Sequence, residues 1–335
     1  MQLKIGIIGL GRIGRIHYNN IRHHIPEADV VMISDVDKNG LPEDVPQVDA
    51  GTLIGHPDVD AVVICSPTDT HADYVDRCAR QGKHVFCEKP LDLSLDRIRE
   101  TLAVVREHNI QLMLGFNRRF DTNFMKLKAL VDEGKIGEVQ LVKITSRDPA
   151  PPSVDYLRSS GGLFLDMTIH DFDMARYVMG KEVKEVYAAA SELTGGAVAE
   201  AGDIDTAVIT LKFEDGSMAV IDNSRKAVYG YDQRLEVFGS KGMAHVENNR
   251  PDNHVYYNES GASSALPLHF FMERYMASYL TEMTAFIKSV QGKLPVPVGG
   301  LDGLKATMLA VAAQQSVAQH APVTVAGEGK PASVS

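Results

Sequence analysis

The chain has 335 residues, of which 44% are hydrophobic and 23% are charged, a composition typical of a globular protein with room for two domains. Its formal net charge of −10 argues against nucleic acid or an anionic membrane surface as a partner, because lysines and arginines supply most of the affinity for phosphate groups. Cys65, Cys78 and Cys87 form no C-x-x-C pair, and no apolar run approaches the roughly 18 residues of a membrane span, so we expect a cytoplasmic protein without disulfides, structural zinc or membrane helices.

The first element is an apolar strand at residues 3–9 that leads directly into a G-x-G-x-x-G turn and then a helix. In this motif Gly9 permits the tight turn, Gly11 lets a pyrophosphate approach the backbone, and Gly14 lets the helix lie close to the strand. The N–H groups at the helix start then face the diphosphate. The expected cofactor-binding residues of this turn are Gly9, Gly11, Arg12, Ile13 and Gly14.

The second apolar run, Asp29–Ser34, ends at Asp35, about 20 residues beyond the last glycine of the turn. A carboxylate at this spacing accepts hydrogen bonds from the adenosine ribose and repels a 2′-phosphate. No arginine follows, since the next residues are Val36, Asp37 and Lys38. The cofactor is therefore predicted to be NAD rather than NADP.

Three further apolar runs alternate with helical segments up to residue 119, a pattern typical of a doubly wound parallel sheet, the Rossmann architecture. The runs are Ala61–Cys65, His84–Cys87 and Gln111–Leu114. Polar residues follow each run at the carboxyl edge of the sheet, where ligands bind in open α/β folds. We therefore expect residues 1–119 to form the NAD-binding domain.

Lys89 lies at this carboxyl edge, directly after a buried strand, and its ammonium group would project toward the nicotinamide. Such a lysine can hydrogen-bond a substrate hydroxyl and favour the alkoxide form by its charge. The alternative is a surface lysine in a turn that Pro90 ends.

The pattern of apolar runs and turns changes in residues 120–335, and the new pattern predicts an α+β domain with a large, open and mostly antiparallel sheet. The expected strands are Gln140–Thr145, Val183–Ala190, Thr206–Phe213, Ser217–Asn223, Arg234–Phe238 and Met243–Glu247. Helices are expected near Phe164–Met179, Phe271–Val290 and Leu301–His320, followed by a frayed tail at Gly327–Ser335. A sheet covered by helices on one face leaves the other face open to a second subunit, so a homo-oligomer, either a dimer or a tetramer, is expected.

The expected helix near Phe164–Met179 carries a polar stripe. At 100° per residue Asp166, His170, Asp173 and Tyr177 share one face, and apolar residues cover the others. Burying such groups without use would cost several kcal/mol, so the stripe predicts a functional cavity in which an imidazole acts as general base beside an orienting carboxylate. A solvated helix face with a structural histidine is one alternative. A divalent metal on Asp166, His170 and Asp173 is another, but hydride transfer to NAD needs none, and no metal is predicted.

Taken together, the motifs GLGRIG, CSPTDTH, EKP and GGLFLDMTIHDFD, with the strand that ends at Asp35, resemble the glucose-fructose oxidoreductase / inositol dehydrogenase / rhizopine catabolism superfamily in the order of that family. The resemblance covers nearly the whole chain. Gly115–Asp121, Tyr229–Asp232 and Phe271–Tyr275 are similar to segments of its inositol dehydrogenase branch.

The resemblance implies a role for individual residues. Lys89 would be catalytic, with Asp166 and His170 as relay and base, and Pro90 would follow a cis peptide bond. The implied contacts on the cofactor side are Ser66, Thr68, His71 and Glu88. The implied substrate-binding residues, in addition to the catalytic three, are Asn117, Arg118, Asp173 and Tyr231, although similar inositol enzymes often carry an apolar residue in place of Asn117.

The expected reaction is the NAD-dependent oxidation of a secondary ring hydroxyl of a cyclic polyol, with myo-inositol to 2-keto-myo-inositol as the leading case. Scyllo-inositol or a pyranose such as glucose presents similar hydroxyls and is the first alternative. A non-catalytic NAD-binding regulator on the same scaffold is the second. It is less favoured, because Lys89, Asp166 and His170 are all present.

Overall fold

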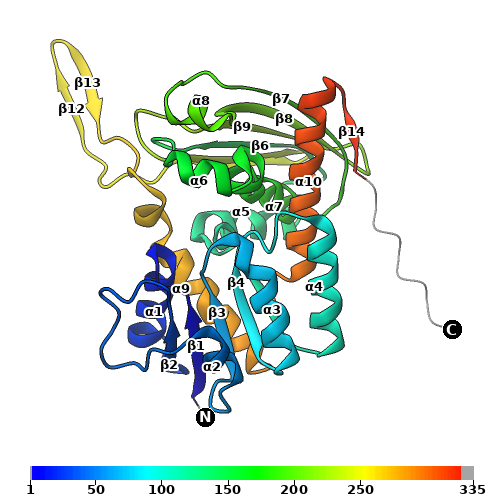
Figure 1. The fold of residues 1–335 in the computed structure, drawn as a ribbon. Coiled ribbons are helices and arrows are strands. Elements are labelled where there is room, and N and C mark those ends of the chain that lie inside the picture. The colour runs from blue at the N-terminus through cyan, green and yellow to red at the C-terminus, as the bar shows by residue number, and fades with distance from the viewer. Residues whose placement is uncertain (1, 326–335) are drawn as a thin grey trace. The chain divides into compact units, whose positions relative to one another are not determined.

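The structure is a computed structural model that describes residues 2–325, and its contacts divide the chain into two compact units (Figure 1). Unit 1 contains the chain up to Thr122 together with Tyr275–Thr307, and unit 2 contains Asn123–Arg274 and the chain from Met308 onward. The sequence predicts one boundary, after residue 119, whereas this division also groups Tyr275–Thr307 with unit 1. The tail that was expected to fray, Gly327–Ser335, lies outside the described residues.

Unit 1 is built on a five-stranded parallel sheet in the order β2-β1-β3-β4-β5, which confirms the doubly wound Rossmann prediction. The strands are β1 Leu3–Ile8, β2 Ala28–Ser34, β3 Ala61–Ile64, β4 His84–Glu88 and β5 Leu112–Gly115. All residues of β3 and β5 are buried, as expected for a parallel sheet covered on both faces.

The helices associated with unit 1 connect these strands or return to them late in the chain. They are α1 Arg12–His24, α2 Ala50–Gly55, α3 His71–Arg80, α4 Leu95–Glu107 and most of α9 Phe271–Val290. Short 3₁₀ turns at Thr68–Thr70 and Asn117–Phe120 follow β3 and β5. Each turn therefore presents polar residues just after a carboxyl end of the sheet.

Unit 2 contains a seven-stranded sheet in the order β11-β10-β6-β9-β8-β7-β14, in which β6 and β9 pair in parallel and all other neighbours are antiparallel. The strands are β6 Val139–Arg147, β7 Val183–Ser191, β8 Thr206–Phe213, β9 Met218–Ser224, β10 Asp232–Gly239, β11 Gly242–Val246 and β14 Val323–Thr324. A separate hairpin joins β12 Val255–Asn258 to β13 Gly261–Ser264 (Figure 1). The expected α+β domain with a mostly antiparallel sheet is thus confirmed.

The helices associated with unit 2 are α5 Thr122–Asp132, α6 Val154–Ser159, α7 Ile169–Met179, α8 Ala197–Ala201 and part of α10 Gly300–Gln319. Along β6 the buried Val142, Ile144 and Ser146 alternate with more exposed residues, and α7 packs against this strand. One face of the sheet is therefore part of the core and carries α7.

The other face of this sheet displays a row of apolar side chains. Met243 pairs with Phe238, Phe238 with Leu141, and Leu141 with Met218, so the four residues cross β11, β10, β6 and β9 side by side. Met243, Phe238 and Met218 are each 45 to 48% exposed. Within residues 2–325 no helix has the length and apolar character that crossing a bilayer demands.

Candidate active-site residues in the two units

The turn between β1 and α1 has the shape of a diphosphate cradle. Gly9 adopts φ +87°, and a Cβ at Gly14 would lie 2.0 Å from the carbonyl oxygen of Gly9, so both positions require glycine. A Cβ at Gly11 would meet nothing within 4 Å, which leaves open space at the start of α1. That space, next to the N–H groups of the first helical turn at Arg12 and Ile13, fits a dinucleotide pyrophosphate.

Asp35 lies beside this cradle, at the end of β2. The backbone N–H of Leu10 donates to Asp35 Oδ2, and the N–H of Asp37 donates to Oδ1 at 2.9 Å. These bonds hold a carboxylate next to the glycine turn, where the adenosine ribose of a bound dinucleotide belongs. The residues present thus fit NAD.

The loops that follow β3 and β4 are joined by His71. Its Nδ1 lies 2.8 Å from the carbonyl oxygen of Pro90, and its Nε2 lies 2.8 Å from the carbonyl oxygen of Ser66. The ring is 2% exposed, so His71 braces the two loops from within. Ser66 Oγ also lies 2.6 Å from Thr70 Oγ1, in the short 3₁₀ turn that contains Thr68.

The segment Glu88-Lys89-Pro90 has the cis Lys89–Pro90 bond that the resemblance implied. Lys89 is partly exposed, whereas the carboxylate of Glu88 lies 3.0 Å from Nε2 of the buried His17. In this structure the Glu88 carboxylate therefore contacts α1. Asn117 and Arg118, in the turn after β5, are each 5% exposed.

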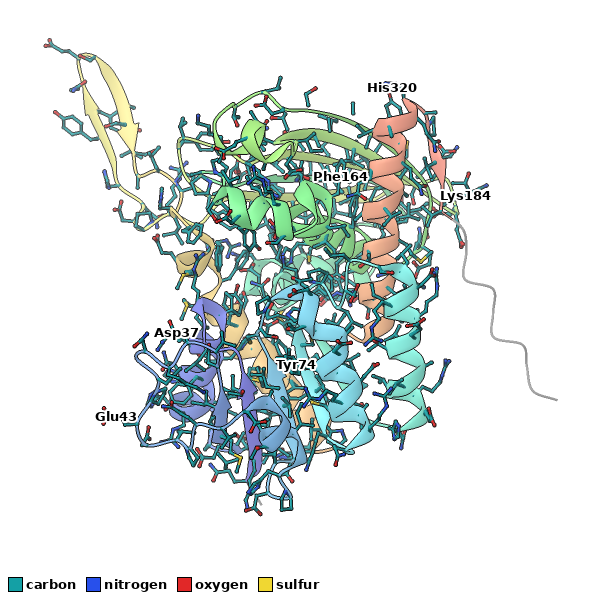
Figure 2. The ribbon with its side chains drawn as sticks, viewed as in Figure 1. Asp37, Glu43, Tyr74, Phe164, Lys184 and His320 are labelled. Carbon is teal, nitrogen blue, oxygen red and sulfur yellow. The ribbon has the colours of Figure 1, made fainter. Side chains whose placement is uncertain are left out.

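In unit 2 the segment with the polar stripe is not a uniform α-helix. Residues Phe164–Thr168 form a π-helical turn, and α7 begins at Ile169; Figure 2 labels Phe164, the first residue of the turn. The constant 100° step that placed Asp166 above His170 does not apply across a π turn, which has i→i+5 hydrogen bonds. His170, Asp173 and Tyr177 keep helical spacing on α7, where Asp173 is 1% exposed and the other two are partly exposed.

Asp166 is held by partners from distant parts of unit 2. Tyr156 donates its hydroxyl proton to Asp166 Oδ1 at 2.8 Å, and Arg225 donates to Oδ2 at 3.1 Å. The Arg225 side chain is 1% exposed and also lies 3.6 Å from Asp203, which accepts the N–H of Leu163. This arrangement fixes both oxygens of Asp166 and compensates its negative charge inside the fold.

A second buried network anchors the same segment to the sheet. Asn223 donates to Asp171 Oδ2 at 2.9 Å, and Thr168 donates to Asn223 Oδ1 at 2.6 Å. These three side chains have no measurable exposure. The start of α7 is therefore tied to β9 by satisfied hydrogen bonds, which gives His170 and Asp173 a rigid support.

Tyr229 and Tyr231 have different surroundings. The Tyr229 hydroxyl donates to Asp232 at 2.6 Å and accepts from Arg147 at 3.1 Å, so it belongs to a local polar cluster. Tyr231 is 6% exposed and its N–H donates to the carbonyl of Leu268. Among the aromatic residues of α9, Tyr279 packs edge-on against His17 in unit 1.

Sequence reasoning missed the residues that support the stripe. Tyr156, Asp203 and Arg225 lie 10 to 59 residues from their partners in the chain, with no periodicity that links them to Asp166. One signal was present: Arg225 directly follows β9, among polar residues at a strand end. A buried arginine after a strand is a reason to look for two carboxylates.

Comparison with known proteins agrees with this arrangement of motifs. Residues 3–116 match the family described as oxidoreductase family, NAD-binding Rossmann fold. Residues 124–245 match the GFO/IDH/MocA C-terminal domain.

Several individual proteins are similar over their whole length. A protein of Thermotoga maritima named myo-inositol 2-dehydrogenase is 50% identical, covering 96% of this chain and 98% of the relative. An inositol 2-dehydrogenase of Rhizobium meliloti is 45% identical, with 97% and 100% covered. The crystal structure of scyllo-inositol dehydrogenase from Lactobacillus casei, with bound NAD(H) and scyllo-inositol, has a TM-score of 0.89 at 34% identity and covers 98% and 100%.

Proposed function

The chain belongs to the GFO/IDH/MocA family of NAD-binding oxidoreductases, and on that premise we propose that it oxidises myo-inositol to 2-keto-myo-inositol. The observation that carries the choice of substrate class is the polar set Asp166, His170 and Asp173 on a segment whose other residues are mostly buried and apolar. Several converging polar groups suit a ring with many hydroxyls better than a simple alcohol. The relatives named for myo-inositol are also more similar than the scyllo-inositol enzyme.

The proposed roles follow from the chemistry of each group. His170 takes the proton of the reacting hydroxyl, Lys89 hydrogen-bonds its oxygen and offsets the developing negative charge, and Asp166 balances the imidazolium that forms. Bound NAD supplies the hydride acceptor. The residues proposed to hold the remaining hydroxyls are Asn117, Arg118, Asp173 and Tyr231.

A panel of polyols tests the proposal directly. The purified protein is assayed by NADH absorbance with myo-inositol, scyllo-inositol, other inositol stereoisomers and glucose, each with NAD and with NADP. We expect the highest kcat/KM with myo-inositol and NAD. A clear preference for scyllo-inositol or glucose would reassign the substrate, and no turnover with any polyol would support a binding protein instead.

We also propose that a second copy of the chain covers the open face of the unit 2 sheet. The row Met243, Phe238, Leu141 and Met218 would otherwise leave large apolar side chains partly in water. Full burial of such a side chain is worth about 1.5–3 kcal/mol, and these half-buried residues would gain part of that. Whether the assembly is a dimer or a tetramer follows from its mass.

Light scattering checks this assembly. The parent protein should have the mass of a dimer or a tetramer, and Phe238→Glu with Met218→Glu should reduce it. The control is Val228→Glu, which introduces a charge at an 85% exposed side chain outside the row and should leave the mass unchanged. A monomeric parent protein would contradict the assignment.

The cytoplasmic location expected from the sequence remains our proposal. Cys65, Cys78 and Cys87 form no disulfide in the structure, which suits a reducing compartment. Burial raises the pKa of the Cys78 thiol to about 12, so this group stays protonated and inert near neutral pH.

A further inference from the structure

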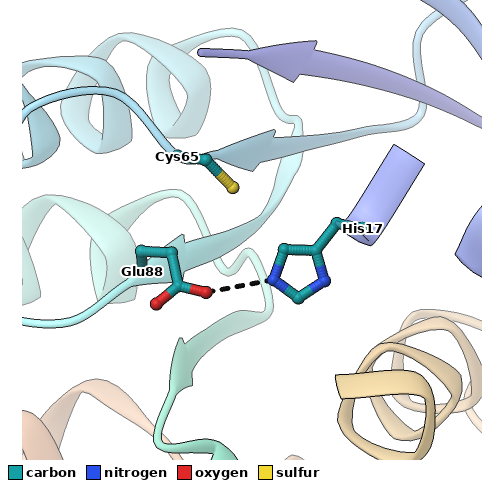
Figure 3. Close-up of side chains that lie close together, drawn as sticks. All are labelled: His17, Cys65 and Glu88. Atoms are coloured by element: carbon teal, nitrogen blue, oxygen red, sulfur yellow. Dashed lines mark hydrogen bonds and ion pairs between the residues drawn. The ribbon is translucent and has the colours of Figure 1, made fainter. Parts of the chain in front are cut away.

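A group of ionisable side chains lies inside unit 1, next to the segment that contains Lys89. His17 from α1, Cys65 after β3 and Glu88 at the end of β4 meet there (Figure 3). Glu282 of α9 joins them, with Oε1 4.0 Å from Nε2 of His17. His17 and Glu282 have no exposed side-chain surface, and neither carboxyl oxygen of Glu282 has a hydrogen-bond partner.

Such a carboxyl group is stable in the interior only if it is neutral or its charge is compensated. Burial, and then the nearby charge of Glu88, raise the pKa of Glu282 well above its ordinary value. His17 Nε2 and Glu88 Oε1 form a hydrogen bond of 3.0 Å in which the imidazole N–H donates. A neutral Glu282 therefore leaves Glu88 as the one charged acceptor that faces this nitrogen.

The donor atoms of His17, Cys65 and Glu88 lie within 4.8 Å of one another, which is close enough to consider a metal ion. A metal would need the thiolate form of cysteine. Burial and the charge of Glu88 raise the pKa of the Cys65 thiol well above its ordinary value, and the imidazole already bonds the Glu88 carboxylate. These features favour a proton-bearing group over a metal centre.

The position of Glu88 gives the group its significance. Lys89 directly follows Glu88, the last residue of β4, so anchoring Glu88 in the core restricts the backbone from which the Lys89 side chain projects. Gly115 on the neighbouring strand leaves room for this anchor, since a Cβ there would lie 2.8 Å from Glu88 Oε2. His17, in turn, lies on the helix whose first turn forms the diphosphate cradle.

We propose that His17 and Glu282 are positioning residues that hold Glu88, and through it Lys89, in place: His17 of the coenzyme-binding helix α1 by its hydrogen bond to Glu88, and Glu282 of α9 by its place beside Nε2 of His17. In this role neither residue acts on the substrate or the cofactor directly. The inference rests on the proposed role of Lys89 in the reaction. A displacement of the reacting group by about 1 Å can cost about 100-fold in rate, so a lock of this kind affects kcat rather than coenzyme binding.

Paired variants of the full-length enzyme test the lock, with the preferred polyol of the panel as substrate. His17→Gln keeps an N–H donor at the position of Nε2, whereas His17→Leu removes it. Glu282→Gln imitates the neutral acid, whereas Glu282→Leu removes the polar group but fills the space. We expect each Leu variant to lose about 10-fold or more in kcat with KM for NAD nearly unchanged, and each Gln variant to stay within about threefold of the parent.

His84→Leu is the matched control, because His84 starts the same strand, β4, at the end opposite Glu88. It should leave kcat unchanged. Lys89→Met in the same assay separates the two hypotheses, since a variant with normal turnover would reject the role of Lys89 itself. If Lys89→Met is slow but both Leu variants turn over like the parent, or if the Gln variants are as slow as the Leu variants, the lock is rejected.

Stability against pH gives a readout that does not depend on turnover. Glu282 has its raised pKa in the folded state only, so the stability it contributes is present below its unfolded pKa of about 4.3 and is lost as pH rises through the folded value. The other titratable groups that face it are His17, Cys65 and Glu88. The Tm of Glu282→Gln minus the Tm of the parent should therefore increase as pH rises from 5 to 9.

An unchanged difference in Tm across this range would contradict a neutral Glu282. Elemental analysis of the native protein completes the test. If the native protein holds one equivalent of metal and Cys65→Ser does not, the group is a metal centre and the lock is rejected. An active enzyme without bound metal supports the lock.

Discussion

Replacing His170 with Ala should lower kcat about 1,000-fold while the enzyme binds NAD as tightly as before. The imidazole is the group proposed to accept the proton of the reacting hydroxyl, and without it this proton must leave to water. His170 is partly exposed on α7, so its removal opens space without breaking the core. The loss should therefore appear in kcat and not in Tm.

Steady-state kinetics with the preferred polyol, together with a binding titration of NAD, measure this effect. Added imidazole should restore part of the activity to the Ala variant, because it can enter the space and accept the proton. His245→Ala, at an exposed histidine of β11, is the control and should behave like the parent enzyme. Normal turnover of the His170 variant would remove the general base from the proposed mechanism.

Helices and strands that depend on local sequence patterns could be located from the sequence. Thr206–Phe213 and Phe271–Val290 have the bounds expected from their apolar periodicity, and the expected Met243–Glu247 differs from β11 by one residue at each end. Apolar alternation and the glycine turn act over a few residues, so a single sequence is enough to locate them.

Features that depend on tertiary contacts could not be predicted in this way. The π turn at Phe164–Thr168 begins just after Gly161 and Gly162, both at positive φ, with the Asp203 carboxylate packed against Gly162. Asp203 is 40 residues away from the helix start that it caps. An ideal helix is the simplest expectation from residue spacing, and it does not anticipate the π turn that contains Asp166.

The buried group around Glu88 shows the same limit. His17 and Glu88 are 71 residues apart in the sequence, and Glu282 arrives with the late segment that returns to unit 1. In the sequence, each of these residues occupies an ordinary position of a helix or strand. Only the fold shows that three chain segments bring two acids and an imidazole to one place.

Lys89→Met should lower kcat by about 100- to 1,000-fold, the cost of removing one donor from a developing oxyanion. Methionine keeps the length and flexibility of the side chain but has no charge and no N–H donor, so the loss reports the ammonium group alone. Lys89→Arg keeps the charge in a larger, planar group and should recover only part of the rate. NAD affinity should not change in either variant.

The kinetic isotope effect makes this expectation specific to the chemical step. With substrate deuterated at the reacting carbon, the effect on kcat should grow in the Met variant, because a slower hydride transfer becomes fully rate-limiting. Lys293→Met, at an exposed position after α9, should show the parent rate and the parent isotope effect. A Met variant that is slow but has the isotope effect of the parent would mean that Lys89 controls a binding or release step, and the oxyanion role would then have to pass to another donor in unit 1 or unit 2.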